Sequence, residues 1–278
     1  GADQMARFIA QLATSKQLLR QPVNVVNKPG NSGMEGLLDV KAAKGNPHKL
    51  VITLSNLFTA PLATGVDFHW QDITPVQMLA LDQFVLWVNA ESAWKTPKDF
   101  FDALKAGPDK ALKMGGTGSK QEDQIITVLL EKAAGRKMTY VPFKGTGDLT
   151  TALLGKHVDA AMTYPTFAVS NKEKTRVLAV ATPNRLPQFP NTPTFRELGF
   201  DWVDGAYRGI AVPKSTPEAV RKQISDLFLK INSEPEHRKQ MQDGGYEQID
   251  ITYDQVGDFM KKRAAETMPL ARQMGLLK

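Results

Sequence analysis

Four glycine-rich turns are the features of this sequence whose residue types and spacing could bind a ligand. Three of them lie between a stretch with strand character and a stretch with helix character, at 28–33, 115–119 and 144–148. The fourth is a partial turn at Gly1-Ala2-Asp3, directly before a helical stretch. Glycine lets a backbone approach a ligand closely, and the free N–H groups at a helix start attract an anion. The chemistry indicated is anion recognition, although each turn alone is also typical of a tight structural connection.

The second of these turns is the most specific, because Thr117 and Ser119 add hydroxyl donors to a helix start. It lacks the spacing of a phosphate-binding loop, and no dinucleotide fingerprint or Gly-x-Ser-x-Gly elbow occurs elsewhere. No histidine stands near Ser119 in the sequence to activate it. These features favour a binding site over a nucleophile, although a distant histidine could fold close to Ser119.

The residue types needed for other site chemistry are missing or badly spaced. The chain has no cysteine, which excludes disulfides, thiol nucleophiles and cysteine metal sites. Its histidines are far apart and lack metal-ligand spacing; they are His48, His69, His157 and His237. We therefore expect no catalytic residue, no metal and no cofactor.

Two tyrosines and one arginine stand at the ends of expected strands. Tyr164 ends one such strand, and Tyr207 and Arg208 precede another. A guanidinium beside a crossing segment could pair with a ligand carboxylate through two hydrogen bonds. Alternatively, the tyrosines could pack at a surface rim, and Arg208 could form a surface salt bridge with Asp201 or Asp204.

The elements that must position these residues alternate along the chain. Short β-branched or apolar runs predict strands, and apolar residues at helical spacing predict helices between most of them. The expected strands are 23–27, 50–54, 84–89, 112–115, 138–142, 160–164, 177–182 and 209–212, and the clearest expected helices are 3–19, 121–134 and 217–231. This alternation indicates an α/β protein with parallel sheets covered on both faces. In such sheets, ligands bind beyond the carboxyl ends of the strands.

A length of 278 residues exceeds the usual size of one hydrophobic core, so two lobes are expected. No low-complexity linker occurs, so each boundary should be a crossing strand, with 89–92 and 205–213 as candidates. The net charge of +6 could attract anions. Basic residues are mixed with acids and do not interleave with aromatics, so we expect no nucleic-acid partner. No apolar run could span a membrane, and no signal segment opens the chain, which we take as a processed form.

Ordered motifs occur along essentially the whole chain. They are GADQMAR at 1–7, VNKPGNSG at 26–33, DITPV at 72–76, the strand at 84–89, GTGS at 116–119, YVPFKG at 140–145, LLG at 153–155 with VD at 158–159, and PTF at 193–195 with Glu197 and Gly199. Together they resemble the motifs of the periplasmic receptors of tripartite tricarboxylate transporters, the Bug family.

The resemblance implies a type II periplasmic-binding-protein fold, with two doubly wound lobes joined by crossing strands and a ligand cleft between them. Lobe 1 would hold residues 1–90 and 213–278, and lobe 2 would hold residues 91–212. The implied function is that of a periplasmic solute-binding receptor. It would capture a small carboxylate, either a di- or tricarboxylate or an aromatic carboxylate, and deliver it to the membrane subunits of the transporter. A monomer that catalyses no reaction is expected.

Carried onto this sequence, the family's carboxylate clamp falls on the turn at the chain start and on the second glycine turn. The clamp residues are Ala2, Asp3, Gly116, Thr117, Gly118 and Ser119. Further cleft candidates are Ser55, Asn56, Lys144, Gly145 and Thr146, together with Tyr164, Tyr207 and Arg208 from the strand ends. The two tyrosines and Phe143 would suit an aromatic acid, whereas Arg208 and Lys144 would suit a second carboxylate.

The chain departs from the family pattern in three places. The family's first strand would precede Gly1, Phe143 stands where tyrosine is usual, and Ala2 stands near a position often held by glycine or a small polar residue. Two alternatives use the same scaffold, namely an enzyme and the ligand-sensing module of a transcription regulator. Sustained turnover of a bound acid would indicate the enzyme. A DNA-binding helix-turn-helix segment, which we do not find in the sequence, would indicate the sensor.

Overall fold

The chain divides into two units, each formed by separate stretches of sequence. The computed structural model describes residues 1–200, 205–273 and 275. Unit 1 comprises Gly1–Leu81, Tyr207–Gln242 and Glu247–Lys278, and unit 2 comprises Asp82–Ala206 and Asp243–Tyr246. Two passages between the units lie within long strands, β2 (Ile73–Gln83) and β8 (Gly205–Pro213), so crossing strands join the units without a linker. These passages fall at 81 and 206, where the resemblance suggested 90 and 212.

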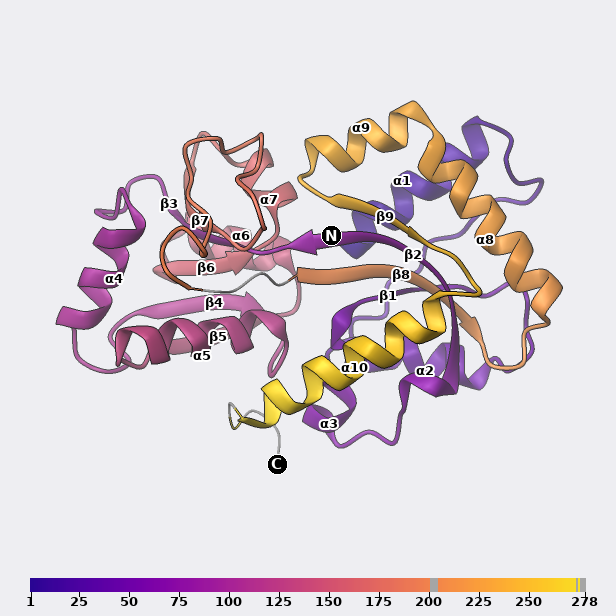
Figure 1. Cartoon of the computed structure of the whole chain (residues 1–278), viewed down its shortest axis with the longest axis horizontal. Helices are drawn as coiled ribbons and strands as arrows, with labels where there is room; N and C mark the ends of the chain where they lie inside the picture. Colours follow the sequence, from indigo (N-terminus) through magenta and orange to yellow (C-terminus); the bar gives the residue numbers. More distant parts are fainter. Residues whose placement is uncertain (201–204, 274, 276–278) are drawn as a thin grey trace. The chain divides into compact units, whose positions relative to one another are not determined.

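Unit 1 is built on a four-stranded sheet with the order β1-β8-β2-β9 (Figure 1). β1 is antiparallel to β8, and β9 is antiparallel to β2. Side chains from helices and sheet share one core, which includes Met34, Phe58 and Met260. Besides β2 and β8, the elements are α1 (Ala2–Ser15), α2 (Met34–Ala42), β1 (Val51–Thr53), two short 3-10 helices (Ser55–Leu57 and Trp70–Asp72), α3 (Ala60–Thr64), α8 (Glu218–Ser233), α9 (Pro235–Asp243), β9 (Glu247–Ile251) and α10 (Val256–Gln273).

Unit 2 is built on a five-stranded sheet with the order β5-β4-β6-β3-β7. β4 is parallel to β5 and to β6, whereas β3 is antiparallel to both β6 and β7. β3 continues directly from β2, a strand of the other sheet, and runs opposite to the strands on either side of it. The elements are β3 (Val85–Asn89), α4 (Pro97–Ala106), β4 (Lys113–Thr117), α5 (Glu122–Ala134), β5 (Thr139–Phe143), α6 (Thr146–Leu154), β6 (Ala160–Thr163), α7 (Pro165–Ser170) and β7 (Thr175–Val180).

Both faces of the unit 2 sheet are covered. Successive residues of β3 alternate between two cores, with Leu86 and Val88 in one and Val85 and Trp87 in the other. Side chains of α4 and α5 complete the first core, and side chains of α6 and α7 complete the second. The predicted α/β architecture is confirmed, but the sheets are antiparallel or mixed and not parallel as the alternation suggested. No helix in the described part of the chain is long and apolar enough to cross a membrane.

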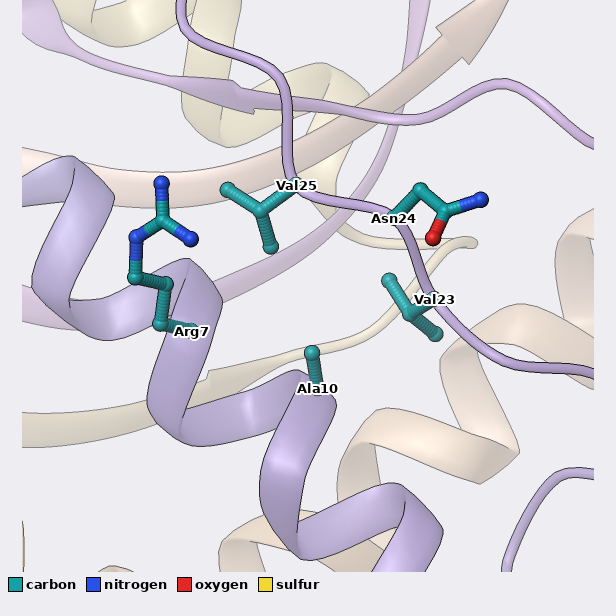
Figure 2. A pocket seen from close by; sticks show the side chains of 5 residues that line it. All are labelled: Arg7, Ala10, Val23, Asn24 and Val25. Carbon is teal, nitrogen blue, oxygen red and sulfur yellow. The ribbon is translucent and has the colours of Figure 1, made fainter.

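The strand predicted at 23–27 is wrong, because this segment joins neither sheet. Val23 and Val25 instead line a hollow of about 390 Å³ together with Arg7 and Ala10 of α1 (Figure 2). The β-branched composition fits an extended segment. A strand also needs a neighbour that accepts and donates its backbone hydrogen bonds, and composition does not reveal whether one is present.

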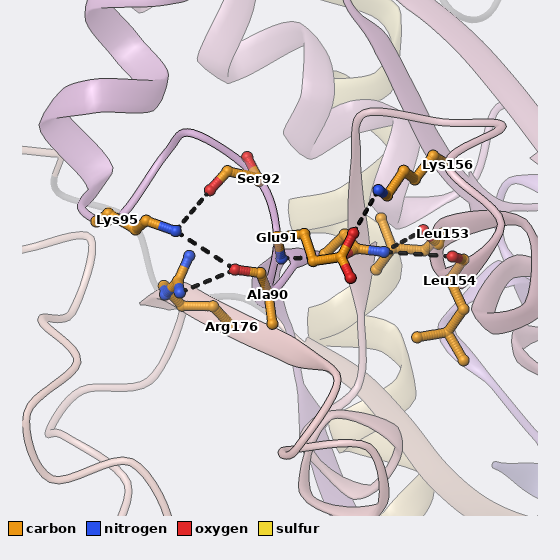
Figure 3. A network of polar contacts seen from close by, with 9 residues as sticks. Ala90, Glu91, Ser92, Lys95, Leu153, Leu154, Lys156 and Arg176 are labelled. Atoms are coloured by element: carbon orange, nitrogen blue, oxygen red, sulfur yellow. Dashed lines mark hydrogen bonds and ion pairs between the residues drawn. The ribbon is translucent and has the colours of Figure 1, made fainter.

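Of the two boundaries suggested by the sequence, 89–92 lies inside unit 2, where it forms the turn after β3. Figure 3 shows how side chains fix this turn. Asn89 Nδ2 donates to the last carbonyls of α6 at 3.3 Å, and Glu91 pairs with Lys156 at 2.5 Å. Arg176 of β7 donates to a carbonyl of the same turn at 3.0 Å. The turn is therefore an anchored part of unit 2 and not a passage between units.

Candidate functional site

Three helix starts meet at one edge of the unit 2 sheet. β4, β5 and β6 run in the same direction, so their carboxyl ends lie at the same edge. α5, α6 and α7 each begin shortly after one of these strands. The structure therefore brings together the glycine turns at 115–119 and 144–148 and the strand-end residue Tyr164. These three features are far apart in the sequence.

The turn that follows β4, residues 116–120, is held by hydrogen bonds within unit 2, and we call it the 116–120 loop. The hydroxyl of Thr117 donates to Asp123 Oδ2 at 2.8 Å, and the amide of Thr117 donates to the same oxygen. The amide of Gly118 donates to the carbonyl of Phe143 at 2.8 Å. The donors of Thr117 and Gly118 thus maintain the loop itself.

Ser119 is the loop residue whose donors remain unused. Its side chain is exposed, and neither its amide nor its hydroxyl has a hydrogen-bond partner among the described residues. The amide of the following residue, Lys120, donates to Gln124 Oε1 at 2.7 Å. Ser119 therefore leaves one N–H and one O–H available to an anion at the end of β4.

A buried carboxyl group supports the loop from the start of α5. Asp123 is 2% exposed, and burial raises the pKa of its carboxyl to about 6, against the hydrogen bonds from Thr117 that favour the charged form. Its second oxygen, Oδ1, has no hydrogen-bond partner in the described part of the chain. Tyr140 of β5 donates its hydroxyl to the carbonyl of Gly118 at 3.0 Å. Burial, with the nearby charge of Asp123, raises the pKa of Tyr140 well above its usual value of 10.0.

Two glycines of the loop are required by packing and by backbone conformation. A Cβ atom at Gly116 would lie 2.4 Å from Tyr140 Oη and 2.9 Å from Asp123 Oδ2. Gly118 has a φ of 66°, in the left-handed region that favours glycine. A Cβ atom there would lie 2.3 Å from Gln121 Nε2. The glycine spacing therefore reflects how closely Tyr140 and Asp123 approach the loop.

The third glycine turn supplies a second helix start at the same sheet edge. Gly145 is the residue before the first turn of α6, and Thr146 begins that helix and is buried. Lys144 is exposed, and its ammonium group has no ion-pair partner among the residues that the structure describes. Tyr164 differs, because its ring is 8% exposed and packs on Phe84 with centroids 4.9 Å apart. This edge therefore offers a cation and helix amides, and the buried Tyr164 adds little aromatic surface to it.

In unit 1, the predicted residues Ala2 and Asp3 form the first turn of α1. Asp3 Oδ1 accepts hydrogen bonds from Asn27 Nδ2 at 2.8 Å and from Arg7 Nε at 2.9 Å. These bonds, the one from Asn27 first, lower the pKa of Asp3. An ionised carboxylate only accepts hydrogen bonds, so the side chain of Asp3 cannot bond a ligand carboxylate directly. Its observed contacts fix the start of α1 and the position of Asn27.

Ser55 and Asn56 are held by further hydrogen bonds within unit 1. Asn56 Nδ2 donates to the carbonyl of Ser32 at 3.1 Å, which ties the first glycine turn to the 3-10 helix Ser55–Leu57. Ser55 Oγ accepts from the amide of Tyr207 at 2.9 Å, which ties that helix to β8. Both side chains are buried. These side-chain bonds of Asp3, Ser55 and Asn56 therefore all go to groups of unit 1 itself, and Ser55 and Tyr207 bond each other.

Tyr207 and Arg208 do not lie at the surface, contrary to the alternative of a rim tyrosine and a surface salt bridge. Tyr207 is 4% exposed, and the guanidinium of Arg263 lies 4.3 Å from its ring centroid. Arg208 is 1% exposed. Asp201 and Asp204, considered as partners of Arg208, lie outside the described residues. Burial places Tyr207 in the unit 1 core, and it gives Arg208 a buried charge that has to be paired.

Sequence reasoning did not single out Asp123, Tyr140 or Asn27 as site residues. The sequence did contain a sign that Asp123 faces the core. Ile126 follows Asp123 by one helical turn and Leu130 follows it by two, and both are buried on α5. Aspartate rarely takes such a core-facing position unless it has a specific partner. The partner, Thr117, precedes it by only six residues, so the pair could have been found from helical periodicity.

The candidate residues form one group in each unit. The group in unit 2 comprises Gly116, Thr117, Gly118, Ser119, Lys144, Gly145, Thr146 and Tyr164. The group in unit 1 comprises Ala2, Asp3, Ser55, Asn56, Tyr207 and Arg208. Of these, Ser119 and Lys144 combine exposure with donors that have no partner among the described residues.

Known proteins resemble this chain over almost its full length. The model of the family described as tripartite tricarboxylate transporter family receptor matches residues 5–276. The UPF0065 protein in the gbd 5′ region of Cupriavidus necator is 27% identical over 266 residues, which cover 95% of this chain and 81% of the relative. Protein BugT of Bordetella pertussis is 29% identical over 229 residues, which cover 77% of this chain and 67% of BugT.

Solved structures share the fold. The periplasmic binding protein BugD aligns with a TM-score of 0.91 at 22% identity, covering 100% of this chain and 94% of BugD. A Rhodopseudomonas palustris protein with adipate aligns with a TM-score of 0.89 at 20% identity, covering 98% of this chain and 92% of that protein. MatC of the same organism, with bound malate, aligns with a TM-score of 0.83 at 21% identity, covering 98% and 94%. The expected fold, that of a periplasmic binding protein, is confirmed.

Proposed function

The chain belongs to the tripartite tricarboxylate transporter receptor family, which is the Bug family of solute-binding proteins, and from this premise we propose that it captures an aliphatic dicarboxylate. Receptors of this family bind solutes and are not enzymes. We further propose that the protein acts in the periplasm and delivers its ligand to the membrane subunits of a transporter.

The proposal of an anionic ligand is supported by the groups at one edge of the unit 2 sheet. Three helix starts converge there, and the amide and hydroxyl of Ser119 have no partner among the described residues. Helix amides and an uncharged hydroxyl favour a carboxylate without needing a metal. One carboxylate of the ligand would accept from Ser119, and the start of α5 would stabilise its charge.

The choice of a dicarboxylate rests on the charge of Lys144 and on the burial of the two tyrosines. Lys144 is exposed at the neighbouring helix start, so it can pair with a second carboxylate. The rings of Tyr164 and Tyr207 are packed in the cores of their units, so they offer little to an aromatic acid. Related structures hold malate and adipate, two aliphatic diacids of different length.

A thermal-shift screen tests the ligand class. Malate and adipate are expected to raise the unfolding midpoint, because a ligand at 100 times its Kd stabilises the native state by about 2.7 kcal/mol. Adipamide, which keeps the length of adipate without its charge, should have no effect. Benzoate should have a smaller effect than the diacids. If no aliphatic diacid moves the midpoint at millimolar concentration, the proposal fails.

Replacement of Ser119 by alanine tests the anion-binding position. We expect Ser119→Ala to raise the Kd for the tightest diacid by about fivefold, as for the loss of roughly 1 kcal/mol of hydrogen bonding. Isothermal titration calorimetry measures the change. Ser170→Ala is the matched control, because Ser170 is exposed on α7 and donates to its own helix at Thr166. An unchanged Kd in Ser119→Ala would exclude the hydroxyl from ligand contact.

A further inference from the structure

We propose that Asp123 is a positioning residue whose carboxylate holds the 116–120 loop in the conformation that presents Ser119, and that protonation of Asp123 weakens ligand binding. The inference rests on the proposed anion-binding role of this loop. The side chain of Asp123 is buried and would affect ligand binding through the loop, without touching the ligand.

The contacts of Asp123 make this control specific. One oxygen, Oδ2, accepts both the amide and the hydroxyl of Thr117, two residues before Ser119. The other loop amides bond neutral acceptors: Gly118 donates to the carbonyl of Phe143, and Lys120 donates to the side-chain amide oxygen of Gln124. Bonds to an ionised acceptor are roughly twice as strong as neutral ones. Asp123 is therefore the strongest single restraint on Thr117.

The surroundings of Asp123 make its charge easy to lose. The side chain is 2% exposed and Oδ1 has no partner in the described part of the chain, so burial raises the pKa of Asp123 to about 6. Tyr140 of β5 faces it, and Glu122 of α5 and Tyr164 at the start of α7 are the further titratable groups of this cluster. The pKa of Tyr140 is raised well above 10.0, so Tyr140 stays neutral when Asp123 titrates.

Protonation of Asp123 makes Oδ2 a weaker acceptor for the two hydrogen bonds from Thr117. With a proton on either oxygen, the two bonds from Thr117 lose their charge assistance and the loop is held less firmly. An ionised Asp123 would also repel a bound anion, and this repulsion by itself would make the affinity rise when Asp123 is protonated. That repulsion reaches the ligand through the exposed side of the loop, where water and salt screen it, whereas the bonds to Thr117 are direct contacts. Loss of the bonds is the larger effect, so affinity falls with pH.

The first test follows the loop without any ligand. In the amide spectrum of the whole protein, the signals of Thr117 and Ser119 should shift together with a midpoint near pH 6 in the wild type. In Asp123→Asn this titration should vanish, because an amide has no charge to lose. Thr117→Val keeps Asp123 but removes one donor, so the midpoint should move to higher pH. Loop signals that do not titrate in the wild type between pH 5 and 8 would overturn the positioning role.

The second test measures the Kd for malate and for adipate by calorimetry at pH 7.5 and 5.5. The ionised fraction of a group with a pKa of about 6 falls to about one quarter at pH 5.5, so the affinity should drop by up to about fourfold. In Asp123→Asn the Kd at pH 7.5 should rise by about fivefold. Its pH dependence should retain only the part due to the ligand's own carboxyl groups, which titrate equally in both proteins.

Asp102→Asn is the matched control, because Asp102 is an exposed acid of unit 2 that pairs with Lys98, and it should behave as the wild type. An affinity that increases as the pH falls, or an Asp123→Asn profile equal to the wild-type profile, would refute the inference. If neither acid binds the wild type, the proposed ligand class is wrong, and the amide titration still decides whether Asp123 positions the loop.

Discussion

Replacing Gly116 by alanine is expected to weaken diacid binding by at least about tenfold while the protein remains folded. The added Cβ atom would lie 2.4 Å from Tyr140 Oη, 2.8 Å from Tyr140 Cε2 and 2.9 Å from Asp123 Oδ2, distances that packed atoms do not tolerate. Tyr140 cannot turn away freely, because its hydroxyl is bonded to the carbonyl of Gly118 at 3.0 Å. Overpacking of this kind typically costs about 1–3 kcal/mol. The strain falls on the loop that carries Ser119.

Calorimetry with malate and adipate measures the Gly116→Ala effect, and circular dichroism checks the fold. Gly257→Ala is the matched control, since a Cβ atom at Gly257 in α10 would meet no atom within 4 Å, and its Kd should equal that of the wild type. Combining Gly116→Ala with Tyr140→Phe removes the closest contact atom and should recover part of the affinity. Wild-type affinity in Gly116→Ala would mean that the loop is not held against Tyr140.

Local patterns were sufficient to predict most of unit 2. The expected strands at 84–89 and 160–164 coincide closely with β3 and β6, and the helix expected at 121–134 coincides with α5. These strands are short apolar runs buried on both faces, and this helix has apolar residues at regular spacing, so sequence and environment agree. The direction of β3 was not predictable from local pattern, because it depends on which segment the strand follows.

Unit 1 shows where local pattern fails. β2 was missed as a strand because Pro75 and Gln77 interrupt its apolar residues, and β9 was missed because it holds only two apolar residues, Ile249 and Ile251. Each strand is stabilised by the other, through antiparallel pairing. Conversely, 23–27 has the composition of a strand but joins neither sheet. Pairing partners far apart in sequence decide these cases, and composition does not identify them.

For the site, glycine spacing indicated the right turns but not the roles of their residues. Thr117 and Ser119 were grouped as equivalent hydroxyl donors, whereas Thr117 bonds Asp123 and Ser119 remains exposed. Tyr207 and Arg208 were predicted from their position at a strand end, and both side chains are buried. The direction in which a side chain points depends on what packs around the strand, so spacing alone could not distinguish a ligand contact from a core contact.

The buried His237 is expected to contribute a loss of folding stability on acidification, and His237→Leu should remove this contribution. His237 of α9 is 0% exposed, and neither ring nitrogen has a hydrogen-bond partner among the described residues. Phe8 lies against it, with ring centroids 6.0 Å apart. Burial lowers the pKa of His237 from 6.5 to about 4, although the nearby charge of Asp250 raises it slightly. The imidazole is therefore neutral in the native state at neutral pH.

The direction of the effect follows from proton binding. Between pH 6.5 and 4 the unfolded chain takes up a proton on His237 and the folded chain does not, so the free energy of unfolding falls as the pH falls through this window. From pH 7.5 to pH 4.5 the loss attributable to His237 should be about 2 to 3 kcal/mol. Urea unfolding at both pH values measures it, as the difference between wild type and His237→Leu. His48→Gln, at an exposed histidine of unit 1, is the control.

The comparison of wild type with His237→Leu is necessary because Asp123 titrates in the same pH range. Its pKa is raised from 3.8 to about 6, so in the same window the folded chain takes up a proton that the unfolded chain does not, and this stabilises the fold as the pH falls. The two effects are similar in size and opposite in sign, so wild-type stability alone could stay nearly constant between pH 6 and pH 4.5 while both groups titrate. The difference between wild type and His237→Leu cancels the contribution of Asp123, because the two residues lie in different units. If that difference is the same at pH 7.5 and pH 4.5, His237 is protonated as readily in the folded chain as in the unfolded chain, and the buried neutral imidazole has to be abandoned.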